Sequence, residues 1–291
     1  MDLKKNKDTN LLIPRSVKEQ FNLNGRLAVI TGGAGFLGVQ FAETISEMGG
    51  TPIILDFNKE FIKSADKKLK DFGCSKYYFF EVDITNEKES ENIIKKIWNE
   101  ISQIDILINC VALTKDTIEK TNADFFEPFE NMDQKLWKKG IELNLTATQL
   151  MCKIVGKKMS KRGKGSIINI ASDVGVISPN HTIYEADMHG YEGVDFNTPS
   201  FYSVGKAGVI HLTKYLATYW AKNNVRVNSI SPAGVYKDHK PGFVEKLSNQ
   251  IPMGRMALPN EFKGAIAFLC SDASSFVTGH NLVIDGGRTI W

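Results

Sequence analysis

The sequence predicts a single-domain α/β fold built on one doubly wound parallel sheet. Its 291 residues are enough for one large domain and few for two independent ones. From residue 26 onwards, apolar runs of strand length alternate with longer segments of helical period, the order that places helices on both faces of a parallel sheet. The runs are nearly continuous in Val, Ile, Leu and Phe, which indicates strands covered on both sides.

The elements follow one another along the chain. Strands are expected at Leu27–Thr31, Pro52–Asp56, Tyr77–Val82, Ile104–Asn109, Ser166–Ala171, Val225–Ile230 and Asn281–Asp285. Helical periodicity predicts helices at Leu37–Met48, Lys59–Phe72, Glu87–Ile101, Gln134–Lys161, Tyr202–Lys222 and Asn260–Ser271. Residues 1–24 are expected to form an N-terminal arm on the surface, and residues 25–291 the domain. Two irregular segments, 172–200 and 233–259, follow strands, so both should emerge at the carboxyl edge of the sheet, where such folds bind ligands.

Composition excludes several classes of protein. Lys and Arg number 36 against 33 Asp and Glu, and a balance of +3 is too small to indicate a nucleic-acid partner. No apolar run approaches the length of a membrane span or of a signal-peptide core. The four cysteines are scattered without metal-like spacing, so we expect free thiols, no metal site and a reducing, cytoplasmic location.

A glycine-rich segment directly follows the first expected strand and opens the first helix. It reads TGGAGFLG over residues 31–38, with Gly-x-Gly-x-x-Gly ending at Gly38. Glycines permit a tight turn and let backbone N–H groups approach a pyrophosphate, whose charge the helix N-terminus favours. Asp56 ends the second strand, 18 positions after Gly38, where a carboxylate accepts hydrogen bonds from the ribose hydroxyls and repels a 2′-phosphate. The pattern predicts a Rossmann-type site that prefers NAD to NADP; the alternative is an ordinary turn beside a solvated carboxylate.

A tyrosine and a lysine begin the helix expected at 202–222. Tyr202 and Lys206 are four residues apart and project from one face. An ammonium group near a phenol favours phenolate, which makes Tyr202 a candidate general acid and base, although a chance surface pair would look the same. Ser172 ends the fifth strand, and Asn144 lies inside a long helix, where Asn is neutral at best without a partner.

With these motifs in place, the sequence resembles the single-domain branch of the short-chain dehydrogenase/reductase family over residues 21–287. The resemblance includes a diverged Asn-Asn-Ala-Gly motif at 109–112, the segment 231–234 and the Asp-Gly-Gly at 285–287. It implies that Tyr202 exchanges a proton with the reacting oxygen, Lys206 holds the nicotinamide ribose, Ser172 positions the substrate oxygen and Asn144 holds a water. The cofactor contacts that it implies are Gly32, Gly35, Phe36, Leu37, Gly38, Asp56, Asp83, Ile84, Asn109, Tyr202, Lys206, Pro232, Gly234 and Val235.

Two departures keep other functions open. Phe36 stands where the branch usually has its middle glycine. The resulting glycine spacing, with Gly32, Gly35 and Gly38, is similar to that of sugar-nucleotide epimerases and dehydratases. The 85 residues after Lys206 are, however, too few for the substrate domain of those enzymes. Lys237 stands where a Thr often touches the carboxamide. The alternatives are therefore an epimerase or dehydratase with bound NAD, a 3-oxoacyl-type ketone reductase, and a non-enzymatic redox sensor. The last 90 residues are similar to oxidoreductases of bacterial surface-sugar and flagellin-modification pathways, which favours a sugar-type substrate and carbohydrate metabolism.

An insertion at about 176–199 separates Ser172 from Tyr202 by 30 residues, where the family usually has about a dozen. Residues 165–205 contain no Lys or Arg, so we expect either a solvated loop or an uncompensated acidic lid over a hydroxyl- or amine-bearing small molecule, with any phosphate towards Lys237, His239, Lys240 or Arg255. The resemblance further implies a homo-oligomer, a tetramer or a dimer, paired through the helices at 134–161 and 202–222. Apolar positions in the second helix exceed what one amphipathic stripe needs.

Overall fold

The computed structural model describes residues 16–113, 125–184 and 197–291, and its centre is a seven-stranded sheet in the order β3-β2-β1-β4-β5-β6-β7. Every neighbouring pair is parallel. The strands are β1 (Leu27–Thr31), β2 (Thr51–Asp56), β3 (Tyr78–Glu81), β4 (Ile106–Asn109), β5 (Gly165–Ile170), β6 (Val225–Pro232) and β7 (Asn281–Ile284). The predicted doubly wound sheet is therefore confirmed. Its order reverses between β1 and β4, the switch point at which such sheets bind ligands.

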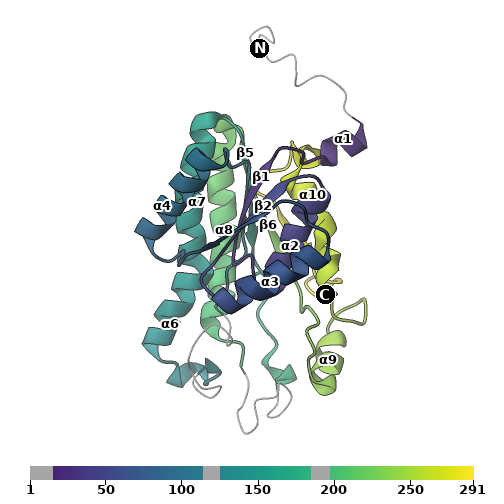
Figure 1. Ribbon diagram of the computed structural model, residues 1–291. Coiled ribbons are helices and arrows are strands. Elements are labelled where there is room, and N and C mark those ends of the chain that lie inside the picture. The colour runs from purple at the N-terminus through teal and green to yellow at the C-terminus, as the bar shows by residue number, and fades with distance from the viewer. Residues whose placement is uncertain (1–15, 114–124, 185–196) are drawn as a thin grey trace, which may run out of the picture.

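Helices cover both faces of the sheet (Figure 1). They are α1 (Val17–Phe21), α2 (Phe36–Glu47), α3 (Lys59–Asp71), α4 (Glu87–Glu100), α6 (Gln134–Ile141), α7 (Ala147–Arg162), α8 (Ser200–Trp220), α9 (Pro241–Ser248) and α10 (Lys263–Cys270). α4, α7 and α8 pack on one face, and α2, α3 and α10 pack on the other. No helix in the described part of the chain is both long enough and apolar enough to span a bilayer.

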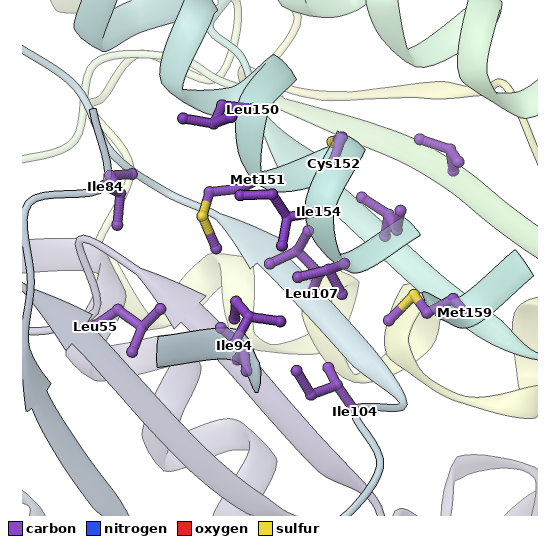
Figure 2. Packing of buried hydrophobic residues seen from close by; sticks show 14 of the residues in the cluster. Leu55, Ile84, Ile94, Ile104, Leu107, Leu150, Met151, Cys152, Ile154 and Met159 are labelled. Carbon is purple, nitrogen blue, oxygen red and sulfur yellow. The ribbon is translucent and has the colours of Figure 1, made fainter. Parts of the chain in front are cut away.

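Alternation along each strand divides the core in two. In β1, Leu27 and Val29 join the cluster under α4 and α7, whereas Ala28 and Ile30 join the cluster under α2 and α10. Figure 2 shows part of the first cluster, where side chains of α7 such as Met151 and Ile154 lie over Leu107 of β4. This two-sided burial explains why the strands read as continuous apolar runs.

The structure departs from the sequence-based expectation in three places. The helix expected over Gln134–Lys161 is interrupted by a π-helical segment at Glu142–Thr146. The segment expected to be irregular, 233–259, contains α9, which begins at Pro241 because proline is well tolerated in the first helical turn. The arm contains α1, started by a Ser16–Glu19 capping box, and Leu23 beyond it is fully buried in the core. The rest of the arm, 1–15, and half of the insertion, 185–196, lie outside the described residues.

Candidate active site

A cavity of about 800 Å³ opens at the carboxyl edge of the sheet, around the switch point. Its described walls come from the loops that follow β1, β2, β3, β4, β5 and β6, together with α8 and α9. All the residues predicted to form the site line this cavity except Asn109 and Asn144. The sequence-based site is thus brought together in one place, with these two side chains behind its wall.

The glycine loop forms one end of the cavity, and its conformation requires glycine. Gly32 has φ +61°, in the left-handed region, and a Cβ on Gly38 would lie 2.4 Å from Gly32 O and 2.6 Å from Gly33 Cα. α2 begins at Phe36 with Gly35 as its N-cap, so the first turn of the helix faces the cavity. Backbone N–H groups at a helix start that no side chain can crowd are what a pyrophosphate needs. The loop therefore fits a dinucleotide.

Asp56 lies beside this loop at the end of β2. Its carboxylate accepts hydrogen bonds from Ala34 N at 3.2 Å and from Asn58 N at 3.1 Å, which ties the strand end to the glycine loop. Burial raises the pKa of Asp56, and the backbone hydrogen bonds from Asn58, Ala34 and Phe57 oppose this increase. The side chain is buried yet lines the cavity, as a ribose-binding carboxylate would. Asp83 and Ile84, just after β3, extend the same wall, and Asp83 Oδ1 accepts from Thr85 N at 2.9 Å.

The opposite wall is formed by the segment that follows β6. Pro232, Gly234 and Val235 line the cavity there, and Val235 makes an isolated parallel bridge with Ala257. A Cβ on Gly234 would lie 2.4 Å from Leu247 Cδ2, so glycine lets α9 close against this segment. The Lys237 ammonium lies 5.6 Å from the centre of the Phe36 ring, so the segment after β6 approaches the start of α2 here.

Ser172, Tyr202 and Lys206 meet in the middle of the cavity. Tyr202 hydrogen-bonds with Ser172, and the Lys206 ammonium lies 5.7 Å from the centre of the Tyr202 ring. Lys206 is buried and donates to Ile170 O at 2.8 Å, so the helix face predicted from the i, i+4 spacing turns towards the end of β5. A Cβ on Gly175 would lie 2.8 Å from Lys206 C, so glycine at this position lets the turn after Ser172 pack directly on α8.

The pKa values of this group reflect burial first. Burial raises the pKa of Tyr202 to about 12; the hydrogen bond with Ser172 lowers it, and the charge of Asp173 raises it further. Burial lowers the pKa of Lys206 to about 8. The expected lowering of the tyrosine pKa by the lysine is thus outweighed by the protein surroundings. A positive charge bound beside the phenol would have to supply the difference.

Asn144 sits behind Tyr202 and Lys206, in the π-helical segment at Glu142–Thr146. Its Nδ2 donates to Gly140 O at 2.9 Å, and its buried Oδ1 has no hydrogen-bond partner among the described residues. A Cβ on Gly205 would lie 2.8 Å from Asn144 Cβ, so glycine in α8 allows the two helices to touch here. π-Helical turns often mark functional positions, and a buried acceptor of this kind suits an ordered water.

The Asn109 side chain points into the core instead of the cavity. Its Nδ2 donates to Asn169 Oδ1 at 2.8 Å and contacts Cys152 Sγ at 3.2 Å, and Asn169 in turn donates to Thr213 Oγ1 at 2.9 Å. This buried polar network links β4 and β5 to α7 and α8. We therefore assign the Asn109 side chain to the support of the cavity and not to its wall.

Several residues near the cavity differ from the sequence-based expectation. Asp173, next to Ser172, forms a buried ion pair with Arg288 after β7. The expectation of uncompensated acidic charge in 165–205 is therefore wrong for Asp173. The other acidic residues of this segment, Glu185, Asp187, Glu192 and Asp195, lie outside the described residues. Arg255, one of the expected phosphate partners, is instead held by two hydrogen bonds to Glu261, at 2.6 and 2.7 Å. Pro241, the first residue of α9, was the one local signal for this helix, which brings Phe243 and Leu247 to the cavity wall.

Known proteins resemble the chain over nearly its whole length. The family model described as short chain dehydrogenase matches residues 26–247. An NAD-dependent glycerol dehydrogenase of Listeria innocua is 34% identical over 94% of this chain and 97% of its own. A D-threitol dehydrogenase of Mycolicibacterium smegmatis is 31% identical over 94% and 97%. The crystal structure of a short chain dehydrogenase from Leptospira borgpetersenii with bound NAD+ is 32% identical, with a TM-score of 0.79 over 96% of this chain and 98% of that one.

Proposed function

The chain belongs to the short-chain dehydrogenase family and is an oxidoreductase of CH–OH groups, and from this premise we propose an NAD-dependent dehydrogenase of a small polyhydroxylated alcohol, such as a polyol or sugar. One observation carries the proposal. The Ser172–Tyr202–Lys206 group and the buried carboxylate of Asp56 line a single cavity together with the glycine loop. A proton-transfer group and a ribose-binding group that line one cavity suit hydride transfer to a dinucleotide.

The cofactor preference follows from Asp56. A nicotinamide dinucleotide supplies the hydride acceptor when it is bound. Asp56 is held by Ala34 N and Asn58 N at the ribose end, so a 2′-phosphate would meet a buried carboxylate. The base of α3 that lines the cavity is Lys68. NAD is accordingly favoured over NADP, and the glycerol dehydrogenase relative is itself named for NAD.

The chain's own residues carry the proton chemistry. Tyr202 takes the proton of the substrate hydroxyl during oxidation and returns it during ketone reduction. Ser172 donates to the substrate oxygen, and Lys206 holds the ribose beside the phenol. The buried Oδ1 of Asn144 suits a water that connects Lys206 to solvent. The raised pKa of Tyr202 opposes phenolate, and a positive charge bound next to the ring would favour it.

The test is NADH formation from glycerol, D-threitol and larger polyols, measured by absorbance with NAD and with NADP. We expect turnover with NAD, and we expect Tyr202→Phe to lower kcat by about 10²–10⁴-fold while the NADH dissociation constant stays within about twofold. Tyr215→Phe is the matched control, since its ring is on the same helix but exposed. Full activity of Tyr202→Phe would refute the assigned role. Bound NAD that interconverts a sugar nucleotide without net NADH would instead favour the epimerase alternative.

A further inference from the structure

Two residues that depart from the family pattern meet at the cavity. Phe36 stands where the branch usually has a glycine, and Lys237 stands where it often has a threonine. Phe36 is the first residue of α2, whereas Lys237 follows β6 in the second half of the chain. In the folded protein the Lys237 ammonium lies 5.6 Å from the centre of the Phe36 ring. The two departures are therefore parts of one contact.

Both side chains are accessible, and both line the cavity, so a ligand bound there can reach them. Phe36 is 38% exposed in spite of its apolar ring, and Lys237 is exposed. A ring face attracts an ammonium through its charge and not through an acceptor lone pair. The contact with the ring is thus compatible with hydrogen bonds from the same ammonium to an anion.

The backbone that carries Lys237 is held on both sides. Before it, Val235 forms the isolated parallel bridge with Ala257. After it, Asp238 has φ +49°, in the left-handed region that aspartate tolerates better than most residues. Lys237 N donates to His239 Nδ1 at 3.1 Å across this turn. The lysine stem therefore starts from a fixed point of the fold, and the aromatic ring has only the side chain to orient.

The glycine loop needs positive charge from elsewhere in the fold. A pyrophosphate is an anion, whereas the start of a helix supplies only about half a positive charge, and residues 31–38 contain no Lys or Arg. Among the other described bases that line the cavity, Lys206 and Arg288 are buried, and Lys68 belongs to α3. Lys237, held against the first residue of α2, is the base that a phosphate at this helix start would meet.

We propose that Phe36 and Lys237 form a latch that binds the pyrophosphate of the dinucleotide. This inference rests on the proposed function, because it concerns the cofactor of the same site. The Phe36 ring orients the Lys237 ammonium, which donates to a phosphate oxygen while backbone N–H groups at the start of α2 donate to the others. A threonine would supply no charge and a glycine no ring, which accounts for the joint departure from the family pattern.

Lys237→Gln is the variant that tests the latch, because glutamine removes the charge from an exposed position. The readout is fluorescence titration with NADH in the absence of substrate. We expect the NADH dissociation constant to rise about 3- to 10-fold at about 10 mM salt. The ratio to wild type should fall towards 1 at about 1 M salt, where the Debye length is only about 3 Å. Lys237→Arg should bind NADH within about twofold of wild type, since arginine keeps the charge and stacks on aromatic rings.

Lys246→Gln is the matched control. It removes the same charge from α9, at a position that does not line the cavity, and should leave NADH binding unchanged. All these side chains lie outside the buried core, so we expect unchanged melting temperatures. Equal dissociation constants for wild type and Lys237→Gln at low salt would overturn the latch alone. A wild-type protein that does not bind NADH would overturn the proposed function together with it.

Fragments of the cofactor identify the group that Lys237 contacts. ADP-ribose contains the pyrophosphate without nicotinamide, and adenosine contains neither. Displacement of NADH should show the full loss for ADP-ribose in Lys237→Gln and none for adenosine. A loss for NADH but not for ADP-ribose would place the contact at the nicotinamide and overturn the assignment. Unchanged NADH binding with weaker inhibition by glycerol 3-phosphate would assign Lys237 to a substrate phosphate instead.

Phe36→Leu tests the role of the ring. Leucine keeps apolar bulk at the start of α2 but has no aromatic face to hold the ammonium. We expect NADH binding about two- to fivefold weaker than in wild type. In this background Lys237→Gln should have a smaller effect than in wild type, because the two side chains act as one unit. Fully additive effects of the two substitutions would overturn the orienting role of Phe36.

Discussion

Gly38→Ala is the substitution whose effect on stability and on cofactor binding follows most directly from the distances in the structure. The added Cβ would stand 2.4 Å from Gly32 O and 2.6 Å from Gly33 Cα, where ordinary contact begins at 3.4 Å. Both atoms belong to the backbone, so α2 and the glycine loop would have to separate by about 1 Å, and no side chain can rotate away to prevent it. Overpacking of this kind costs about 1–3 kcal/mol of stability.

The same displacement moves the helix start away from the phosphate position. A misplacement of about 1 Å at a binding group costs on the order of 10²-fold in kcat/KM, so we expect the NADH dissociation constant to rise at least about tenfold. The assays are urea denaturation for the free energy of unfolding and fluorescence titration for NADH binding. Wild-type stability and affinity in Gly38→Ala would refute the role of this glycine in both.

Gly264→Ala is the matched control, because it is also a glycine near the start of a helix. Gly264 lies in α10, is exposed, and a Cβ there would meet nothing within 4 Å. We expect this variant to gain about 0.5–1 kcal/mol of stability through its better helix propensity, with NADH affinity unchanged. A loss of stability equal to that of Gly38→Ala would show that close approach is not the cause.

Three further predictions concern charge and assembly. Asp56→Ala should lower the ratio of kcat/KM with NAD to kcat/KM with NADP, because the carboxylate that repels a 2′-phosphate is gone. An unchanged ratio would contradict this role of Asp56. Lys206→Met tests the lysine pKa of about 8. Between about pH 8 and 10.5 the unfolded wild-type chain binds more protons than the folded one, so the free energy of unfolding of the wild type relative to Lys206→Met should rise by up to about 3 kcal/mol as pH increases through this window. A difference between the two proteins in urea denaturation that does not change with pH would refute the buried lysine. Tyr215 and Tyr219 stack with ring centres 6.1 Å apart on the exposed face of α8. We therefore expect a homo-oligomer, a tetramer or a dimer, whose mass in light scattering falls when both tyrosines are changed to Lys. A wild-type protein that is monomeric at micromolar concentration would refute this interface.

The sequence predicted well those features that depend on neighbouring residues. Strand positions such as Leu27–Thr31 agree with the structure because burial on both faces leaves a continuous apolar run. The glycine loop was recognisable because close backbone approach tolerates no other residue there. Tyr202 and Lys206 were assigned to one helix face by their spacing alone, and the structure places both at the cavity.

Other features were decided only when distant segments came together. Every residue of β4 is buried, so its sequence carried no alternation to reveal that Asn109 points away from the cavity. The raised pKa of Tyr202 depends on burial by several elements, and the spacing of Tyr202 and Lys206 in the sequence does not reveal that burial. The Asp173–Arg288 pair joins residues that share no local pattern, and it exists because parallel strands bring all their carboxyl ends to one edge. The sequence by itself thus determined the fold and predicted which side chains would meet at the cavity, since both depend on short-range spacing. The tertiary structure decided the charge balance and the shape of the cavity, since both depend on what the folded sheet places side by side.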